Sequence, residues 1–122
     1  MIAYTTLGTN DLAKAASFYD ELLAVIGAKR HIDMDRIILW SVVPGHPMLS
    51  VCKPYDGKPA TVGNGTMVAI NVDKKETVDA LYEKALQLGG TDEGAPGLRG
   101  FFYIGYVRDL DGNKLNFFYG GG

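Results

Sequence analysis

A neutral amide lies among large apolar residues near the end of this 122-residue chain. In the closing segment RDLDGNKLNFFYGGG, residues 111–113 read Asp-Gly-Asn, a tight-turn pattern, because Gly and Asn accept the backbone angles that a strand reversal needs. The strand predicted after the turn, residues 114–119, alternates between two faces. Asn116 shares a face with Lys114 and Phe118. Its side chain offers a hydrogen-bond donor and an acceptor but no charge.

The other reactive side chains give no pattern of covalent catalysis. His31, in a predicted strand, and His46, in a predicted turn, are expected at the surface. No Ser-His-Asp or Cys-His spacing is present, and the glycine-rich stretches lack the lysine of a phosphate loop. Cys52 is the only cysteine, so an internal disulfide is excluded and a buried small side chain is expected.

Composition and charge narrow the classes of partner. The chain is 47% hydrophobic and 21% charged, with a net charge of −2 and no cluster of Lys or Arg. Nucleic acid and anionic membrane surfaces both require concentrated positive potential, so neither is expected. No apolar run approaches the ~20 residues of a membrane span. The N-terminus lacks a secretion signal pattern. We therefore predict a cytoplasmic protein whose partners are small molecules or other proteins.

The chain repeats one supersecondary unit, since the segment that begins at Tyr4 aligns with the one that begins at Met67. Each copy predicts a strand, an amphipathic helix and three further strands. The predicted fold is α+β, with two tandem βαβββ modules in a single domain of 122 residues. The first module covers residues 1–54 and the second residues 66–122, and residues 55–65 form a turn-rich linker.

Helix start signals follow the first strand of each copy. Asn10 or Asp11 can cap the first helix, and Asp73 with Glu76 forms a capping-box pattern at the second. One helix per module covers only one face of its sheet. The other face is free to contact a ligand.

The two faces of the second module differ in character. Leu115 and Phe117 suit the side of the helix, which places Asn116 and Phe118 on the opposite side with Met67. When two curved modules lie edge to edge, such faces can form a partly apolar cleft for a small ligand.

Aromatic residues precede the closing hairpin. Strand alternation places either Phe101 with Tyr103, or Phe102 with Tyr106, in the cleft, where a ring can stack on a flat ligand. Arg99 precedes this strand and is expected within reach of an anionic group. The predicted ligand-contacting residues are Tyr4, Trp40, Met67, Arg99, Tyr103, Tyr106, Asn116 and Phe118.

These features resemble the vicinal oxygen chelate superfamily, which contains glyoxalase I, bleomycin-resistance proteins and extradiol dioxygenases. The resemblance spans almost the whole chain and rests on the duplicated unit and on the segments TNDLAKAASFYDELL, GAPGLRGFFYIGYVRD and VRDLDGNKLN. Leu110 replaces the proline that family members often carry in this last turn. The resemblance implies curved mixed sheets that form a cleft, and a homodimer.

The resemblance also implies four metal-ligand positions, usually His or Glu. Here they hold Tyr4, Leu49, Met67 and Asn116, and a register shift of one residue replaces Leu49 with Ser50. Divalent ions need several imidazole, carboxylate or thiolate donors. We therefore expect no metal and no other cofactor.

The leading hypothesis is a protein that binds a small molecule in a metal-free cleft, similar in architecture to bleomycin-resistance proteins. The alternative is a metal-dependent enzyme, a lactoylglutathione-lyase-like lyase or isomerase, or a dioxygenase, with a divalent metal held by other donors. A metal-free enzyme would need Tyr4 with a pKa well below ~10. A third hypothesis is an interaction module with a filled interior.

Overall fold

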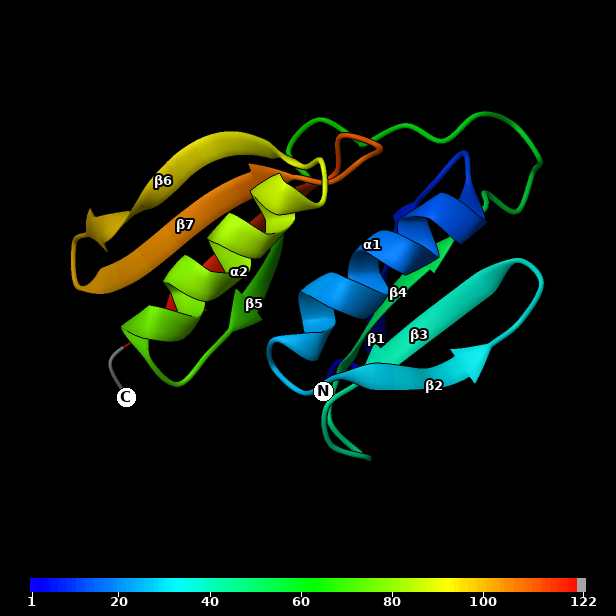
Figure 1. The fold of residues 1–122 in the computed structure, drawn as a ribbon. Coiled ribbons are helices and arrows are strands. Elements are labelled where there is room, and N and C mark those ends of the chain that lie inside the picture. The colour runs from blue at the N-terminus through cyan, green and yellow to red at the C-terminus, as the bar shows by residue number, and fades with distance from the viewer. Residues whose placement is uncertain (121–122) are drawn as a thin grey trace. The chain divides into compact units, whose positions relative to one another are not determined.

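The structure is a computed structural model that describes residues 1–120. The chain divides into two compact units, residues 1–63 and 64–122, and the division falls inside the predicted linker. Each unit has the predicted order of strand, helix and three strands (Figure 1). The elements are β1 (Tyr4–Gly8), α1 (Leu12–Ala24), β2 (Lys29–Asp33), β3 (Ile37–Ser41), β4 (Met48–Cys52), β5 (Val68–Asn71), α2 (Lys75–Gln87), β6 (Thr91–Arg99), β7 (Phe102–Arg108) and β8 (Lys114–Tyr119).

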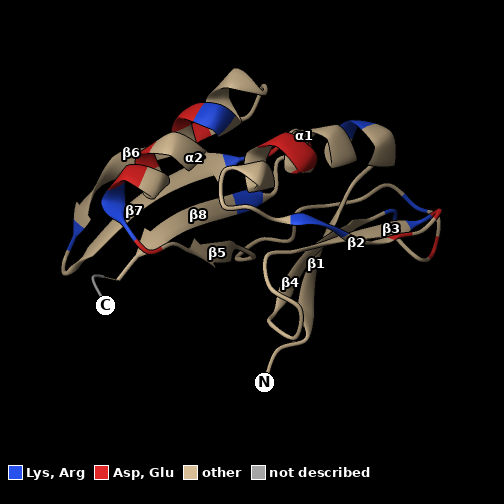
Figure 2. Ribbon diagram, turned by 60° about the horizontal axis from the view of Figure 1, so that its bottom comes forward, with Lys and Arg blue, Asp and Glu red and all other residues tan. Residues whose placement is uncertain are grey.

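Both units contain a four-stranded sheet with the same topology. The strand orders are β1-β4-β3-β2 and β5-β8-β7-β6. The first strand of each unit pairs in parallel with the last, and the remaining pairs are antiparallel. In each unit, described by itself, the helix packs on one face of its own sheet (Figures 1 and 2). The α+β fold predicted from the sequence is therefore confirmed.

Side-chain capping differs between the two helices. The Asp11 carboxylate accepts a hydrogen bond from the backbone N–H of Lys14 at 3.1 Å, which caps α1 as predicted. The cap of α2 is Lys74, with no side-chain hydrogen bond. The predicted capping box of Asp73 and Glu76 is wrong, because the helix begins one residue later and Glu76 is no longer the third helical residue. Glu76 still lies in the first turn, where the helix dipole favours a negative charge.

The core of the second unit lies between α2 and one face of its sheet. Leu115 and Phe117 are fully buried on this side, as alternation along the closing strand predicts. Val107 of β7 joins them, and all three meet the apolar stripe of α2. The members of that stripe with no exposed surface are Val78, Leu81 and Ala85.

The turn between β7 and β8 is built around a buried carboxylate. One oxygen of Asp109 accepts the backbone N–H groups of Asp111 and Asn113, each at 2.9 Å, and the other accepts the Asn113 amide at 3.0 Å. Gly112 has φ 89°, a conformation that glycine adopts without strain. The turn fixes the pairing of β7 with β8 and thereby the face on which Asn116 lies.

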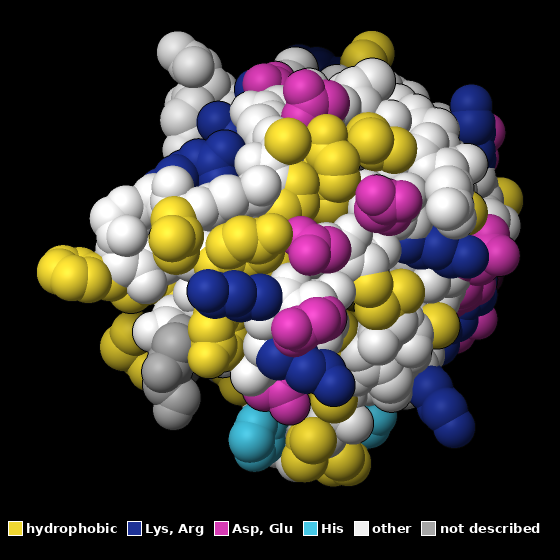
Figure 3. Space-filling model, turned by 60° about the vertical axis from the view of Figure 1, so that its left-hand side comes forward, with side chains coloured by type: hydrophobic (Ala, Val, Ile, Leu, Met, Phe, Trp, Pro, Cys, Tyr) yellow, Lys and Arg dark blue, Asp and Glu magenta, His cyan; other side chains and the backbone are white. Residues whose placement is uncertain are grey.

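Charged side chains of both signs are distributed over the described surface. On the ribbon of Figure 2 both units contain positions of Lys or Arg and of Asp or Glu, and on the face seen in Figure 3 the two kinds of charge are interspersed with hydrophobic side chains. Within residues 1–120, neither helix has the length and hydropathy to cross a membrane.

Replacement of Asp109 by Ala is expected to lower the free energy of unfolding by about 3 kcal/mol, because three donors of the turn, two of them buried, lose a charged acceptor. Asp109→Asn keeps one acceptor and is expected to lose less. Urea denaturation of the wild type and the two variants measures the order of their stabilities. Equal stability of Asp109→Ala and the wild type would show that the turn does not depend on this carboxylate.

Candidate functional site

Strand register assigns the side chains of the second sheet to two faces. Ala69 pairs with Asn116, and Asn116 pairs with Tyr106. Because Leu115 and Phe117 lie under α2, their neighbours in the sequence point to the other side. We call this side the helix-free face of the second sheet. Its described residues include Met67, Ala69, Asn71, Arg99, Phe102, Ile104, Tyr106, Arg108, Lys114, Asn116 and Phe118.

Asn116 lies in the middle of the helix-free face with an unsatisfied hydrogen-bond acceptor. Its side chain is 4% exposed, and no group of residues 1–120 donates to its Oδ1 atom. Its cross-strand neighbour in β5 is Ala69, which has no polar side-chain atom. A buried acceptor of this kind costs free energy unless a donor reaches it. The amide is thus the buried polar group of this face whose acceptor the described residues leave unpaired.

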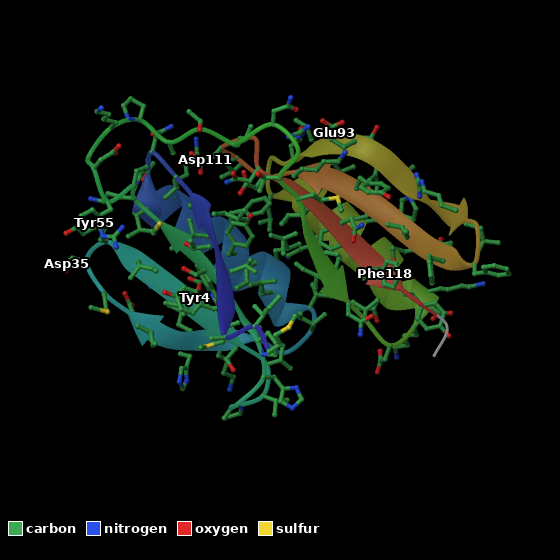
Figure 4. The ribbon with its side chains drawn as sticks, turned by 180° about the vertical axis from the view of Figure 1, so that it is seen from behind. Tyr4, Asp35, Tyr55, Glu93, Asp111 and Phe118 are labelled. Atoms are coloured by element: carbon green, nitrogen blue, oxygen red, sulfur yellow. The ribbon has the colours of Figure 1, made fainter. Side chains whose placement is uncertain are left out.

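Aromatic rings lie on one side of Asn116. The rings of Phe102 and Phe118 are 4.8 Å apart between centroids and tilted by 42°. Figure 4 views the sheet from the side opposite to Figure 1, with Phe118 labelled on β8. The two rings give this end of the helix-free face an apolar surface.

Two cations lie over the ring of Tyr106, the cross-strand partner of Asn116. The guanidinium of Arg99 lies 4.9 Å from the centroid of the Tyr106 ring, and the Lys114 ammonium lies 5.2 Å from it. Gly94 permits this approach, since a Cβ atom there would lie 3.1 Å from both the guanidinium and the ring. Such cation–π contacts hold the two charges near Asn116.

These two cations have no carboxylate partner among residues 1–120. Arg99 donates to the backbone carbonyls of Ile104 and Ala95, which carry no net charge. By contrast, Arg108 forms an ion pair with Glu93 at 2.6 Å. The charges of Arg99 and Lys114 are therefore uncompensated by a described ion pair.

The first unit has a different set of polar groups on its corresponding face. Thr6 and Ser50 are cross-strand partners, and their hydroxyl oxygens lie 3.0 Å apart. The Thr6 hydroxyl also donates to the sulfur of Cys52 at 3.4 Å. Tyr4, 47% exposed, begins the strand on the same face (Figure 4). Cys52 is half-buried rather than buried as predicted.

Three of the predicted site residues lie on helix-covered faces instead. Trp40 is 2% exposed, packs on the Tyr19 ring of α1 and donates its indole N–H to Asp20 at 2.9 Å. Leu49 pairs with Trp40 and shares its face, so Ser50 takes the position expected for Leu49. These placements correct the sequence-based assignments of both residues.

Tyr103 is the third predicted site residue that lies on a helix-covered face. Its hydroxyl donates to Asp79 of α2 at 2.7 Å, and this hydrogen bond raises the pKa of the phenol. Of the two alternatives for β7, the helix-free face therefore carries Phe102 with Tyr106. Phe101 lies in the turn before β7 and is 94% exposed.

The remaining predicted residues lie on the uncovered faces of two different units. Tyr4 belongs to the first unit, and the second unit brings together Met67, Arg99, Tyr106, Asn116 and Phe118. Sequence reasoning missed the contact of Lys114 with Tyr106, although Lys114 and Asn116 project from the same face of β8. The cleft expected between the modules stays a prediction.

The family's metal positions do not fit a divalent ion. On the uncovered faces they hold a phenol and a hydroxyl, Tyr4 and Ser50, in the first unit, and a thioether and a neutral amide, Met67 and Asn116, in the second. Within neither unit do the described residues bring three or more His, Cys, Asp or Glu side chains together. Zn²⁺, Fe²⁺ and Mn²⁺ require stronger donors than these.

A hollow of about 660 Å³ lies on the helix side of the first sheet, lined by the start of α1 and the β2–β3 hairpin. Its arginine, Arg30, is already paired with Asp20 at 2.7 Å and with Asp33 at 2.9 Å, and Asp11 caps α1. Three of its charged groups, Asp11, Arg30 and Asp33, are thus engaged within the protein, whereas no described ion pair involves Asp35 or Lys53, which also line it. The helix-free face of the second sheet is the better candidate.

Comparisons with known proteins agree with this fold. The family model described as the Glyoxalase/Bleomycin resistance protein/Dioxygenase superfamily matches residues 1–117. A glyoxalase/bleomycin resistance protein from Albidiferax ferrireducens T118 is 32% identical, with a TM-score of 0.91 over 98% of both chains. A search of curated proteins finds no match. The chain belongs to the glyoxalase/bleomycin resistance protein/dioxygenase superfamily.

More distant structures share the fold. A glyoxalase-related enzyme from Fulvimarina pelagi is 25% identical, with a TM-score of 0.77 over 98% of this chain and 87% of that one. The lactoylglutathione lyase from Agrobacterium tumefaciens is 22% identical, with a TM-score of 0.72 over 99% and 94%. At this identity, the second likeness concerns the fold alone.

Replacement of Asn116 by Leu is expected to raise the free energy of unfolding of the unliganded protein by about 1 kcal/mol, because an unpaired buried amide gives way to an apolar side chain of similar size. Asn113→Leu is the matched control. Asn113 is equally buried but hydrogen-bonded to Asp109, so its loss is expected to destabilise. Chemical denaturation compares the two, and a large destabilisation by Asn116→Leu would contradict the unsatisfied state of this amide.

Asp20 is expected to make the stability of the first unit depend on pH. Its hydrogen bonds to Arg30, and then to Trp40, hold the pKa of the carboxyl below its ordinary value of 3.8. A depressed pKa stabilises the fold above the ordinary value, and the effect is lost as the pH falls through the folded-state pKa. Asp20→Asn is therefore expected to be less stable than the wild type at pH 7, and the difference is expected to shrink below about pH 4. Urea unfolding followed by Trp40 fluorescence tests this, and a difference independent of pH would refute it.

Proposed function

We propose that the helix-free face of the second sheet binds a small organic molecule without a metal ion. The observation that carries the proposal is Asn116, which is 4% exposed and has an Oδ1 atom with no donor among residues 1–120. Buried polar groups in stable folds are normally hydrogen-bonded. A ligand that supplies the missing donor removes this cost when it binds.

The neighbours of Asn116 support the same proposal. Small-molecule sites combine apolar and aromatic surface with a few convergent polar groups. Here the tilted rings of Phe102 and Phe118 supply the apolar surface. Arg99 and Lys114, held over Tyr106, supply positive charge.

The metal-free part of the proposal rests on donor chemistry. The side chains at the family's metal positions are a phenol, a hydroxyl, a thioether and a neutral amide, and none of these supplies a charge that offsets the dehydration of a divalent ion. Elemental analysis of purified protein is expected to find no Zn, Fe, Mn or Ni above background. About one ion per chain, retained on dialysis and lost on substitution of Tyr4 or Asn116, would overturn this part.

The binding part has its own test. Backbone amide NMR with a library of aromatic and carboxylate fragments is expected to show shifts at β5, β7 and β8 on the helix-free face. Phe118→Ala is expected to weaken binding of the strongest fragment by about tenfold, because one ring of the aromatic pair is lost. Phe101→Ala removes a ring of the same type from the exposed hairpin turn and is expected to leave binding unchanged. Equal effects of the two substitutions would count against the site.

We propose binding and no reaction, since no specific observation favours catalysis by the described residues. A homodimer in the cytoplasm remains the expectation for its assembly and location. Size-exclusion chromatography with light scattering measures the assembly directly.

A further inference from the structure

We infer that the ligand of the helix-free face is an aromatic carboxylate that carries an N–H or O–H donor between its ring and its carboxylate. The inference rests on the proposed function and specifies the class of ligand. It follows from the order of three kinds of group along β8 and its neighbours. That order is a cationic end, a neutral acceptor and an aromatic end.

The spacing comes from the strand itself. Lys114, Asn116 and Phe118 are alternate residues of β8 and project on the same side. Alternate residues of an antiparallel strand are roughly 7 Å apart, so the Cα atoms of Lys114 and Phe118 are separated by roughly 13 Å. A single-ring molecule with a short acidic side arm spans the distance between the tips of these two long side chains. The linear order selects a ligand with the same linear order of groups.

The cationic end fits a carboxylate. Arg99 and Lys114 lie on the Tyr106 ring and form no described ion pair, whereas Arg108 on the same face is neutralised by Glu93. A lysine ammonium is a compact charge on a flexible stem, so it can move from the ring to a bound anion. A charge-assisted hydrogen bond to a carboxylate is stronger than a cation–π contact near the surface. The exchange therefore favours an anionic ligand over a neutral one.

Asn116, in the middle position, requires a hydrogen-bond donor from the ligand. Ala69, the cross-strand neighbour of Asn116 in β5, has no polar side chain, and Oδ1 has no donor among residues 1–120. Oδ1 is enclosed in the structure, so the amide must turn about its broad, roughly two-fold terminal torsion to present the oxygen to a ligand, and the same turn places the amide N–H2 group in the enclosed position. A ligand without a donor leaves the acceptor unpaired and is discriminated against.

The aromatic end fits a ring. The rings of Phe102 and Phe118 are tilted by 42°, an arrangement in which a third ring meets one of them edge-on or with an offset stack. Ile104, the cross-strand partner of Phe118, is buried, so the two rings supply the accessible apolar surface at this end. The three groups together describe an amphipathic anion with its donor in the centre.

Hippurate is the probe that tests this order, since it carries a phenyl ring, one amide N–H and one carboxylate. Two close analogues each lack one feature. N-Benzoylsarcosine has a methyl group in place of the N–H hydrogen, and hippuramide has a neutral amide in place of the carboxylate. Titrations followed by backbone amide NMR are expected to show hippurate binding at least tenfold more tightly than either analogue, with shifts centred on β7 and β8.

Two variants connect each preference to one side chain, and a third variant is the control. Asn116→Leu is expected to abolish the preference for hippurate over N-benzoylsarcosine. Lys114→Met is expected to abolish most of the preference over hippuramide. Lys58→Met removes the same charge from an exposed position in the other unit and is expected to change neither preference. The amide spectrum of each variant shows whether it is folded, and the comparison of probes on the wild type is independent of the variants.

The outcomes separate the ligand class from the proposed function. Equal affinity for the three probes, or binding of neutral fragments at this face in place of hippurate, overturns the ligand class and leaves the proposed function standing. Absence of any shift on the helix-free face, with hippurate and with the whole fragment library, overturns both. Loss of the preference over hippuramide in Lys58→Met would show that net charge, and not Lys114, selects the ligand.

Discussion

Each sheet of this protein has one helix, and the pleat of its strands divides the side chains between a covered and an uncovered face. In the second unit, Leu115 and Phe117 are fully buried beneath α2, while Asn116 and Phe118 project to the other side. A shift of one residue in the pairing of β7 with β8 would exchange the two sets. The Asp109 turn resists that shift, because its carboxylate holds three donors of the same loop. Stability and the chemistry of the site thus depend on one register.

The two units use the same topology for different surfaces. In the first, Thr6 and Ser50 occupy paired strands and their hydroxyls bond to each other at 3.0 Å. In the second, the paired positions hold Ala69 and Asn116, so the polar side chain has an apolar partner. One pair satisfies itself within the protein, and the other leaves an acceptor for an external donor. This asymmetry between related units is the main reason to place the proposed binding site on the second sheet.

Charge and aromatic surface are also distributed unequally around Asn116. The cations lie over Tyr106, the cross-strand partner of Asn116, and the Phe102–Phe118 pair lies toward the end of β8. Gly94 contributes by the absence of a side chain, which lets the guanidinium of Arg99 approach the ring. The close likeness to a superfamily member from Albidiferax ferrireducens T118 concerns the architecture that carries these groups. The specificity that we propose for the face would come from the groups themselves.

The sequence by itself determined the duplicated unit, the order of strands and helices, and the two faces of β8, because alternation there is clear and Asp-Gly-Asn marks the turn. Tertiary structure alone decided where Trp40 points, because Ile38, Leu39 and Trp40 of β3 are all buried and such a run shows no alternation of polar and apolar residues. The side of Leu49 follows from its pairing with Trp40. It likewise decided that Tyr103 bonds to α2 and that Arg99 reaches Tyr106, because the register shifts within β6 change the pairing without a local sequence signal. Contacts between residues distant in sequence follow from pairing and packing, which local patterns do not encode.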